Sequence, residues 1–239
     1  KRAEYNSAIP GQHPLTSTLP DSNPPVKVQP MTNPFCDDED DDDTPDGLET
    51  EPKVIITTKD GKKVVTDIAT RLMTERIIWL GTDVNNRSAN RIVRQLTFLA
   101  LDDPKKPITL YLNSPGGSIV DGMAIYDTIK RSSAPVHCIV SGMAASMGAV
   151  ILSGCAKGHR KILAHGEVLL HQPLGGARGQ ATDVEISAKR ILKMKETLLQ
   201  ILAANCGQPF EKVAEDCDRD YWLDASEAKA YGIVDEILK

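Results

Sequence analysis

From residue 53 onward, short apolar runs rich in β-branched residues alternate with longer segments whose apolar residues recur with a helical period. The short runs are typical of strands and lie at residues 54–58, 64–65, 77–80, 108–112, 136–140, 161–163, 168–170 and 233–238. Asp60-Gly61, between the first two runs, is the sequence signal of a β-hairpin. Because helical segments separate most of the other runs, the pattern predicts an α/β fold with a parallel sheet.

The helical segments lie at residues 67–76, 85–101, 118–129, 146–153, 182–206 and 225–231. Thr182-x-x-Glu185 and Asp224-x-x-Glu227 have the pattern of capping boxes, which predicts that helices begin there. The helix after Thr182 is the longest, because about 24 residues span roughly 36 Å before Gly207 ends it. Its apolar band is broad, so two interpretations stay open: packing in the core, or contact with a second subunit.

Residues 1–52 differ from the rest of the chain. They hold nine of the 15 prolines and an acidic run from Asp37 to Asp43, without sustained hydrophobic periodicity. Such sequence cannot bury enough apolar surface to offset the entropy of ordering, so we expect a disordered extension before a domain at residues 53–239. A solvating tail and a docking or sorting segment both fit this composition. Since the chain opens with Lys1, we expect that an upstream piece has been removed.

Composition excludes some classes of protein. No run of about 18 apolar residues is present, so no membrane span is expected. The five cysteines are odd in number and form no C-x-x-C motif, which favours free thiols in a reducing compartment. The net charge of −5 arises in the first 50 residues, which hold eleven acidic and three basic residues, and it gives no support for nucleic-acid binding.

Candidate chemistry centres on Ser146, which lies in the stretch Ser141-Gly-Met-Ala-Ala-Ser-Met-Gly-Ala, a predicted turn that runs into a helix. Its small neighbours would let a substrate backbone approach the hydroxyl. A helix that begins at Ser146 would direct free N–H groups at a developing oxyanion, and Gly116-Gly117 could add an unshielded amide. The surroundings do not match the G-x-S-x-G elbow of α/β-hydrolases.

A serine hydroxyl needs an adjacent base, and an imidazole base needs a carboxylate to hold the correct tautomer. His171, 25 residues after Ser146, and Asp220, 49 residues after His171, are the candidates for these two roles. Spacing alone leaves other interpretations open. Ser146 could be a small residue in a tight helix contact, His171 a hydrogen-bonded core histidine, and Asp220 a surface acid paired with Arg219.

Five segments carry a more specific signal: Thr74-Glu-Arg-Ile-Ile-Trp-Leu-Gly, Leu112-Asn-Ser-Pro-Gly-Gly-Ser, Ser141-Gly-Met-Ala-Ala-Ser-Met-Gly-Ala, Leu170-His-Gln-Pro-Leu-Gly-Gly-Ala-Arg-Gly-Gln-Ala-Thr-Asp and Tyr231-Gly-Ile-Val-Asp. Together they closely resemble the ClpP family of self-compartmentalised serine proteases. The resemblance covers residues 54–238 in uninterrupted order. It implies that Ser146 is the nucleophile, His171 the base and Asp220 the orienting acid, while the backbone amides of Gly117 and Met147 form the oxyanion hole.

The resemblance also implies a crotonase-like ClpP fold that assembles into stacked heptameric rings around a chamber. The hairpin at about residues 54–65 would line the axial pore, and the handle region, at about residues 175–206, would form the contact between rings. No cofactor and no metal are expected. Because the chain has no G-x-x-x-x-G-K-[ST] motif, a separate Clp-type (ClpC-type) AAA+ ATPase would have to unfold the protein substrates. The other expected partners are ClpP-type and ClpR-type subunits.

Two features depart from the family pattern. One is the long N-terminal extension, which fits a nuclear-encoded plastid subunit and leads us to expect the chloroplast stroma, with the mitochondrial matrix or bacterial cytoplasm as alternatives. The other is Ala164-His165, where the family usually has Pro-Asn. We therefore interpret His165 as a loop residue, and His137 and His159 as structural or exposed.

Three functions remain to be distinguished. The first is an active serine endopeptidase subunit that cuts unfolded proteins into short peptides. The second is a structural ring subunit whose triad is intact but silent. The third is an acyl-CoA hydratase or isomerase of crotonase type, which also uses glycine-amide oxyanion holes but usually relies on carboxylates.

Overall fold

The computed structural model describes residues 53–57, 61–176 and 178–239, and these residues belong to one compact unit. The expected disorder of residues 1–52 therefore falls outside the described residues, as does Asp60 of the predicted Asp60-Gly61 turn.

The predicted hairpin is confirmed. Strands β1 (Lys53–Thr57) and β2 (Lys63–Asp67) pair antiparallel, from Lys53 opposite Asp67 to Thr57 opposite Lys63. Burial alternates along β1, as expected for a strand whose successive side chains point to opposite faces.

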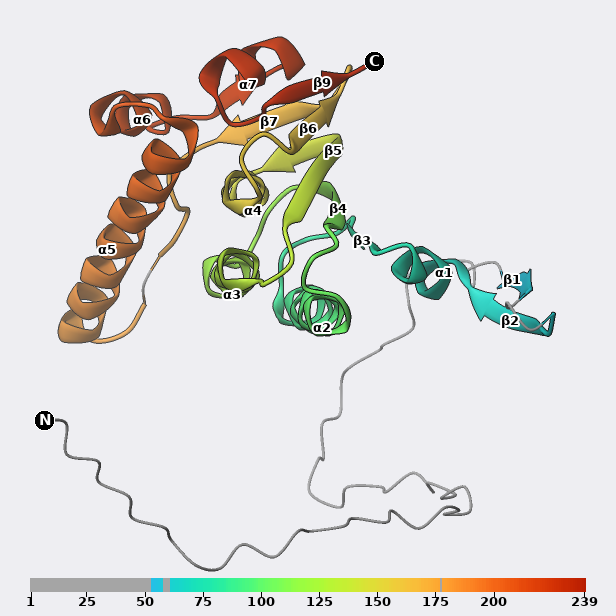
Figure 1. The fold of residues 1–239 in the computed structure, drawn as a ribbon. Coiled ribbons are helices and arrows are strands. Elements are labelled where there is room, and N and C mark those ends of the chain that lie inside the picture. The colour runs from blue at the N-terminus through green and yellow to red at the C-terminus, as the bar shows by residue number, and fades with distance from the viewer. Residues whose placement is uncertain (1–52, 58–60, 177) are drawn as a thin grey trace, which may run out of the picture. The chain divides into compact units, whose positions relative to one another are not determined.

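A seven-stranded sheet runs through the described residues (Figure 1). Its strands are β3 (Ile77–Leu80), β4 (Ile108–Ser114), β5 (Val136–Ala145), β6 (Arg160–Leu163), β7 (Glu167–Leu170), β8 (Tyr221–Leu223) and β9 (Glu236–Leu238). The order β3-β4-β5-β6-β9 is parallel throughout, and β7 pairs parallel with β5. The predicted parallel α/β sheet is therefore confirmed, with one antiparallel addition, β8 against β7.

Strand β5 is longer than its sequence suggested. The prediction of a turn across residues 141–145 is wrong, because the strand continues to Ala145. It does so by changing neighbours: residues 138–140 pair with β6, and residues 143–145 pair with β7. A second parallel partner satisfies the backbone of the extension, so the turn is delayed until Ser146.

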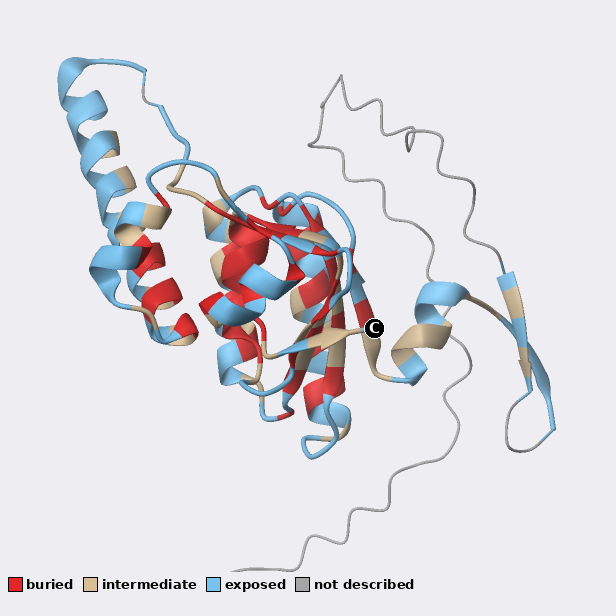
Figure 2. Ribbon diagram, turned by 90° about the horizontal axis from the view of Figure 1, so that it is seen from above, coloured by how far each residue is buried: buried red, intermediate tan, exposed pale blue. Residues whose placement is uncertain are grey.

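Helices connect the strands. They are α1 (Ile68–Thr74), α2 (Asn86–Asp102), α3 (Ile119–Arg131), α4 (Met147–Gly154), α5 (Ala181–Cys206), α6 (Phe210–Asp216) and α7 (Ala225–Tyr231). Figure 1 shows α2, α3 and α4 side by side along one face of the sheet. Buried residues, red in Figure 2, concentrate where these helices meet the strands.

The predicted helix boundaries hold to within about two residues, but one predicted capping box is wrong. The Asp224 side chain accepts the amides of Ser226 and Glu227, which confirms that capping box. The box at Thr182 does not form, because α5 already begins at Ala181 after extended Gln180, which places Thr182 inside the first turn. Helix α5 has 26 residues and ends at Gly207 in the left-handed conformation, as expected.

The sequence patterns missed α6 and β8, which are short, and made the last strand too long. Helix α6 has one buried residue, Val213, so it carries little of the apolar periodicity on which the prediction depended. Among the described residues, no helix combines the length and apolar character needed to cross a bilayer.

Candidate active site

Ser146 stands at the junction between β5 and α4. Its backbone has φ 54° and ψ −119°, a conformation that non-glycine residues rarely adopt and that clusters at functional sites. Its amide donates to the Leu169 carbonyl at 2.9 Å, and its own carbonyl accepts the Ala149 amide at 3.0 Å. The Ser146 side chain does not cap α4, which leaves the hydroxyl available for other chemistry.

The turn after β4 passes directly beside Ser146. A Cβ on Gly116 would lie 2.7 Å from the Ser146 Cβ, so only glycine permits this approach. Gly117 has φ +140°, and a Cβ there would lie 2.4 Å from the Val84 carbonyl oxygen. Two backbone hydrogen bonds join this turn to Val84: the Val84 amide donates to the Gly116 carbonyl, and the Val84 carbonyl accepts the Ser118 amide. Neither bond uses the Gly117 amide, which lies between them.

The other candidate oxyanion donor is the amide of Met147. Met147 is the first residue of α4, and the first N–H groups of a helix have no acceptor within that helix. All eight residues of α4 are buried, so the N-terminal end of its dipole acts in a poorly solvated environment.

His171 follows β7 directly, and Asp220 directly precedes β8. Because β7 and β8 are antiparallel with Leu170 opposite Tyr221, continuing the register places His171 opposite Asp220. The His171 Nδ1 atom lies 3.5 Å from the Asp220 Oδ1 atom. The two side chains differ in burial, since His171 is 14% exposed and Asp220 is 67% exposed.

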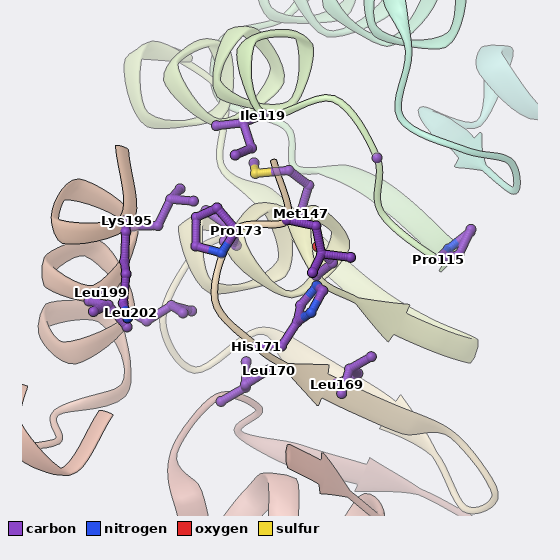
Figure 3. A pocket seen from close by; sticks show the side chains of 15 residues that line it. Pro115, Ile119, Met147, Leu169, Leu170, His171, Pro173, Lys195, Leu199 and Leu202 are labelled. Atoms are coloured by element: carbon purple, nitrogen blue, oxygen red, sulfur yellow. The ribbon is translucent and has the colours of Figure 1, made fainter. Parts of the chain in front are cut away.

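Ser146 and His171 both line one pocket of about 360 Å³. Figure 3 shows Lys195, Leu199 and Leu202 projecting into this pocket from α5, with Met147 and His171 on the other side. Among the hydrogen bonds of the described residues, none joins the Ser146 hydroxyl to His171; such bonds are often loose before substrate binds.

The pocket lining is mostly apolar. It consists of Pro115, Gly117, Ile119, Ser146, Met147, Val150, Leu169, Leu170, His171, Pro173, Leu174, Lys195, Leu198, Leu199 and Leu202. These lining residues, all within the described part of the chain, include no Asp or Glu. Lys195 is therefore the one side chain in this lining that carries a permanent charge.

The remaining described histidines lie outside this pocket. His137 and His159 stack with ring centroids 3.9 Å apart and planes 7° from parallel. Partial burial lowers the pKa of His137, and the charges of His159 and Lys161 lower it further. His165 lies in the turn between β6 and β7, so the interpretation as a loop residue is confirmed.

No described cysteine competes with Ser146 as the nucleophile. Cys138, Cys155, Cys206 and Cys217 are free and buried, and none lines the pocket. Burial raises the pKa of Cys206 to about 11 and that of Cys217 to about 12, so both remain thiols at neutral pH. Within the described ranges, no group of three or more His, Cys, Asp or Glu side chains could hold a metal ion.

One part of the site was missed by the sequence interpretation. Gln172, the residue after His171, accepts a hydrogen bond from Lys195 Nζ at 2.7 Å and donates to the Asp218 carbonyl at 2.8 Å. The available signal was the position of Lys195 within an otherwise apolar helical face. That pattern can indicate a polar contact at a helix surface, but it does not name the contact's partner.

These features define a class: an α/β protein whose pocket holds a serine at a strained strand-to-helix junction together with a histidine that faces a carboxylate, an arrangement typical of serine hydrolases. Comparison with protein-family models then gives the family. The model described as Clp protease matches residues 60–239. The chain therefore belongs to the Clp protease family, which supports a peptidase of the ClpP type, and its α/β fold is consistent with the fold of that family.

Proposed function

We propose that this chain is a serine endopeptidase subunit of a Clp protease core, with Ser146, His171 and Asp220 as its catalytic triad. The observation that carries the proposal is the meeting of three separate chain segments. The end of β5 brings Ser146, and the end of β7 brings His171, to one pocket. The start of β8 brings Asp220 to 3.5 Å from His171. Family membership adds independent support.

In the proposed reaction, the Ser146 hydroxyl attacks the carbonyl carbon of a peptide bond while the unprotonated nitrogen of His171 takes its proton. The resulting imidazolium faces the Asp220 carboxylate, which holds the ring in the tautomer that directs Nε2 toward the serine. His171 then returns the proton to the leaving amine. Water hydrolyses the acyl-serine by the same steps in reverse, which regenerates the free hydroxyl.

The negative charge that develops on the carbonyl oxygen needs donors already in place. Gly117, Ser146 and Met147 line the same pocket, and the amides of Gly117 and Met147 are the proposed oxyanion hole. Removing one such donor typically costs about 100- to 1,000-fold in rate. The close fit of Gly116 and Gly117 against their neighbours fixes one donor, and the buried helix α4 fixes the other.

The pocket also indicates the kind of side chain beside the cleaved bond. Its lining is dominated by Leu, Met, Ile, Val and Pro, which suits apolar side chains of the kind that unfolded proteins expose. We therefore propose unfolded polypeptides as substrates and short peptides as products. As the described residues contain no nucleotide-binding motif of the G-x-x-x-x-G-K-[ST] type, a separate Clp-type AAA+ ATPase would supply the unfolded chains.

Assembly into stacked heptameric rings with ClpP-type and ClpR-type neighbours is part of the proposal. Support comes from α5, whose first part exposes the large apolar side chains Val184, Ile186 and Leu192. Contact with another subunit along this stretch would bury these apolar side chains. In this arrangement the handle region would join the rings, and the hairpin β1–β2 would line the axial pore.

We also propose the chloroplast stroma as the site of action, on the basis of the Pro-rich and acidic sequence at residues 1–52. Microscopy of the full-length precursor fused to a fluorescent protein would test this. Plastid fluorescence would agree with the proposal, and an exclusively mitochondrial signal would overturn it.

The function itself is tested by degradation of an unfolded model protein. The assembled core, with its ATPase, would carry either the wild-type chain or Ser146→Ala, in a background where all other nucleophilic serines are replaced by alanine. We expect degradation with the wild-type chain and none above background with Ser146→Ala. Equal rates for the two cores would sink the triad assignment, provided that both have the same particle mass.

A silent structural subunit is the second candidate, and one observation favours it. The His171–Asp220 separation of 3.5 Å is long for a strong hydrogen bond, and Asp220 is largely exposed. Normal assembly without any Ser146-dependent cleavage would establish this role. The crotonase-type hydratase is disfavoured, because no carboxylate is among the described residues that line the pocket.

A further inference from the structure

A chain of side-chain hydrogen bonds runs from α5 to the segment that carries Asp220. Lys195 Nζ donates to Gln172 Oε1 at 2.7 Å. Gln172 Nε2 donates to the Asp218 carbonyl oxygen at 2.8 Å and also lies 3.4 Å from the Asp218 carboxylate. Three segments that are distant in sequence, at residues 172, 195 and 218, are thereby joined.

The chemistry of these groups permits one arrangement only. A lysine ammonium has donors and no acceptor, while a backbone carbonyl can only accept. The Gln172 amide must therefore direct its oxygen at Lys195 and its NH₂ group at Asp218. Without Lys195, the Gln172 amide keeps only its bonds to Asp218 and loses the contact that anchors it to α5.

The Lys195–Gln172–Asp218 chain of hydrogen bonds, called the clamp below, lies where the pairing of β7 with β8 ends. The last ladder pair is Leu170 with Tyr221, so His171 and Asp220 lie just beyond the backbone pairing that would hold them together. Within the described part of the chain, the Asp220 carboxylate has one side-chain partner, the ring of His171. Gln172, the residue after His171, bonds across the same gap to Asp218, which lies two residues before Asp220.

We propose that Lys195 is a positioning residue for the triad, acting through Gln172 and Asp218 rather than by contact with the reacting atoms. By fixing the Gln172 amide it holds the segment at residues 218–220 against the end of β7, and this sets the distance between Asp220 and His171. The inference rests on the proposed function, because it assigns no activity of its own.

The alternative role for Lys195 is direct contact with substrate, since its side chain also lines the pocket. The two roles predict different kinetics. A lost substrate contact raises KM, whereas a misplaced catalytic group lowers kcat with KM unchanged. A displacement of about 1 Å can reduce the rate by roughly 100-fold, so the effect on kcat is measurable.

The test uses assembled cores in which this chain is the one subunit that keeps its nucleophilic serine. Peptide hydrolysis is measured for the wild-type chain, Lys195→Met, Gln172→Leu and the double variant. We expect each of the three to lower kcat by about 10- to 100-fold with KM unchanged. The double variant should be no slower than the slower single variant, because both substitutions break the same clamp.

Two further variants control for general damage to α5. Lys195→Arg keeps a cationic donor and should retain most of the activity. Lys193→Met removes an exposed lysine two residues earlier on the same helix and should match wild type. If Lys195→Met prevents assembly, Gln172→Leu is used instead, because it leaves α5 unchanged. A lower kcat with unchanged KM in that variant supports the positioning role, and an unchanged kcat contradicts it.

Several results would contradict the inference: unchanged kcat in Lys195→Met, a rise in KM alone, or independent and additive losses from the two single substitutions. The outcome also separates the inference from the function that underlies it. If wild type and Ser146→Ala are equally inactive, the proposed function fails. If only Ser146→Ala is inactive and Lys195→Met equals wild type, the positioning role alone fails.

Discussion

The two parts of helix α5 differ sharply. Its C-terminal part packs on the core, with five residues buried: Leu198, Leu199, Leu202, Ala203 and Cys206. None of the residues from 181 to 197 is buried, and Leu192 is 65% exposed although it is as apolar as Leu202. One helix thus completes the core with its C-terminal part and leaves large apolar side chains exposed in its N-terminal part.

The candidate active site lies at the boundary between these two parts, since Lys195 and Leu198 both line its pocket. Like α5, the site has a buried side and an exposed side. Ser146 is fixed by the sheet and by buried α4, whereas Asp220 is 67% exposed. The Ser146 side of the site should therefore depend on core packing. The Asp220 side should depend on a few polar contacts.

The largest expected effect is on the exposed side. Asp220→Asn keeps the shape of the side chain but removes the charge that faces His171, and it favours the wrong imidazole tautomer. We expect peptide hydrolysis by this subunit to fall by about 10,000-fold, with particle mass unchanged. An active variant would mean that the exposed carboxylate takes no part in catalysis.

On the buried side, Gly117→Ala should impair catalysis through geometry. The new Cβ would lie 2.4 Å from the Val84 carbonyl oxygen, so the turn must shift and carry the Gly117 amide away from the oxyanion position. We expect about a 100- to 1,000-fold loss in kcat. Gly61→Ala is the control, because Gly61 also has positive φ but a Cβ there would meet no atom within 4 Å; equal losses in both variants would contradict this account.

Core stability should depend on the buried pair Arg160–Asp235. Arg160 is 2% exposed, and its Nη2 and Nε atoms donate to the two Asp235 oxygens at 2.6 and 2.9 Å. Asp235→Asn leaves the arginine charge uncompensated, so we expect a loss of about 3–5 kcal/mol in the free energy of unfolding. Denaturant titration of the isolated chain measures it, and a change below about 1 kcal/mol would contradict the prediction.

The same pair predicts a pH dependence. Burial acts to raise the pKa of Asp235, but hydrogen bonds from the Arg160 side chain and from the amides of Arg160 and Gly158 outweigh it, so the net pKa is lowered. Since the folded pKa lies below the unfolded value of about 3.9, this stabilisation is complete above that pH and is lost as pH falls through the folded value. Asp235→Asn should therefore weaken the dependence of stability on pH below about 4.

The smallest expected effect is that of Leu192→Ala in the exposed part of α5, compared with Leu202→Ala in its buried part. Leu202→Ala opens a cavity beside a residue that is 3% exposed and should cost about 2–5 kcal/mol in unfolding free energy. Leu192→Ala should change the stability of the isolated chain by less than about 0.5 kcal/mol. If α5 joins rings, Leu192→Ala should nevertheless weaken assembly, as measured by particle mass; equal stability losses would contradict the comparison.

Much of the fold could be predicted because its strands and helices carry strong periodic signals. The hairpin, the parallel sheet, α2, α3 and the end of α5 followed from apolar spacing and capping residues. Two of the errors have a common cause. The extension of β5 depends on pairing with β7, and β8 is short and depends on the same strand, so neither is specified by local sequence.

For the candidate site, the motifs predicted which residues come together but not the contacts that surround them. Ser146 and His171 lie in one pocket and His171 faces Asp220, as the motifs suggested, but the catalytic roles themselves stay a prediction. The Lys195–Gln172–Asp218 clamp could not be predicted, because its three members come from separate segments and are joined only when β7, α5 and β8 are in place.

The central claim is that Ser146 is an activated nucleophile in the assembled protein. The most direct measurement is mass spectrometry of the native complex after treatment with a fluorophosphonate, which reacts with activated serines. The account predicts an adduct on Ser146 of this chain, and none on the same peptide when Asp220→Asn is treated for the same short time. An unmodified Ser146 in a complex whose neighbouring subunits are labelled would contradict the claim and make this chain a structural subunit.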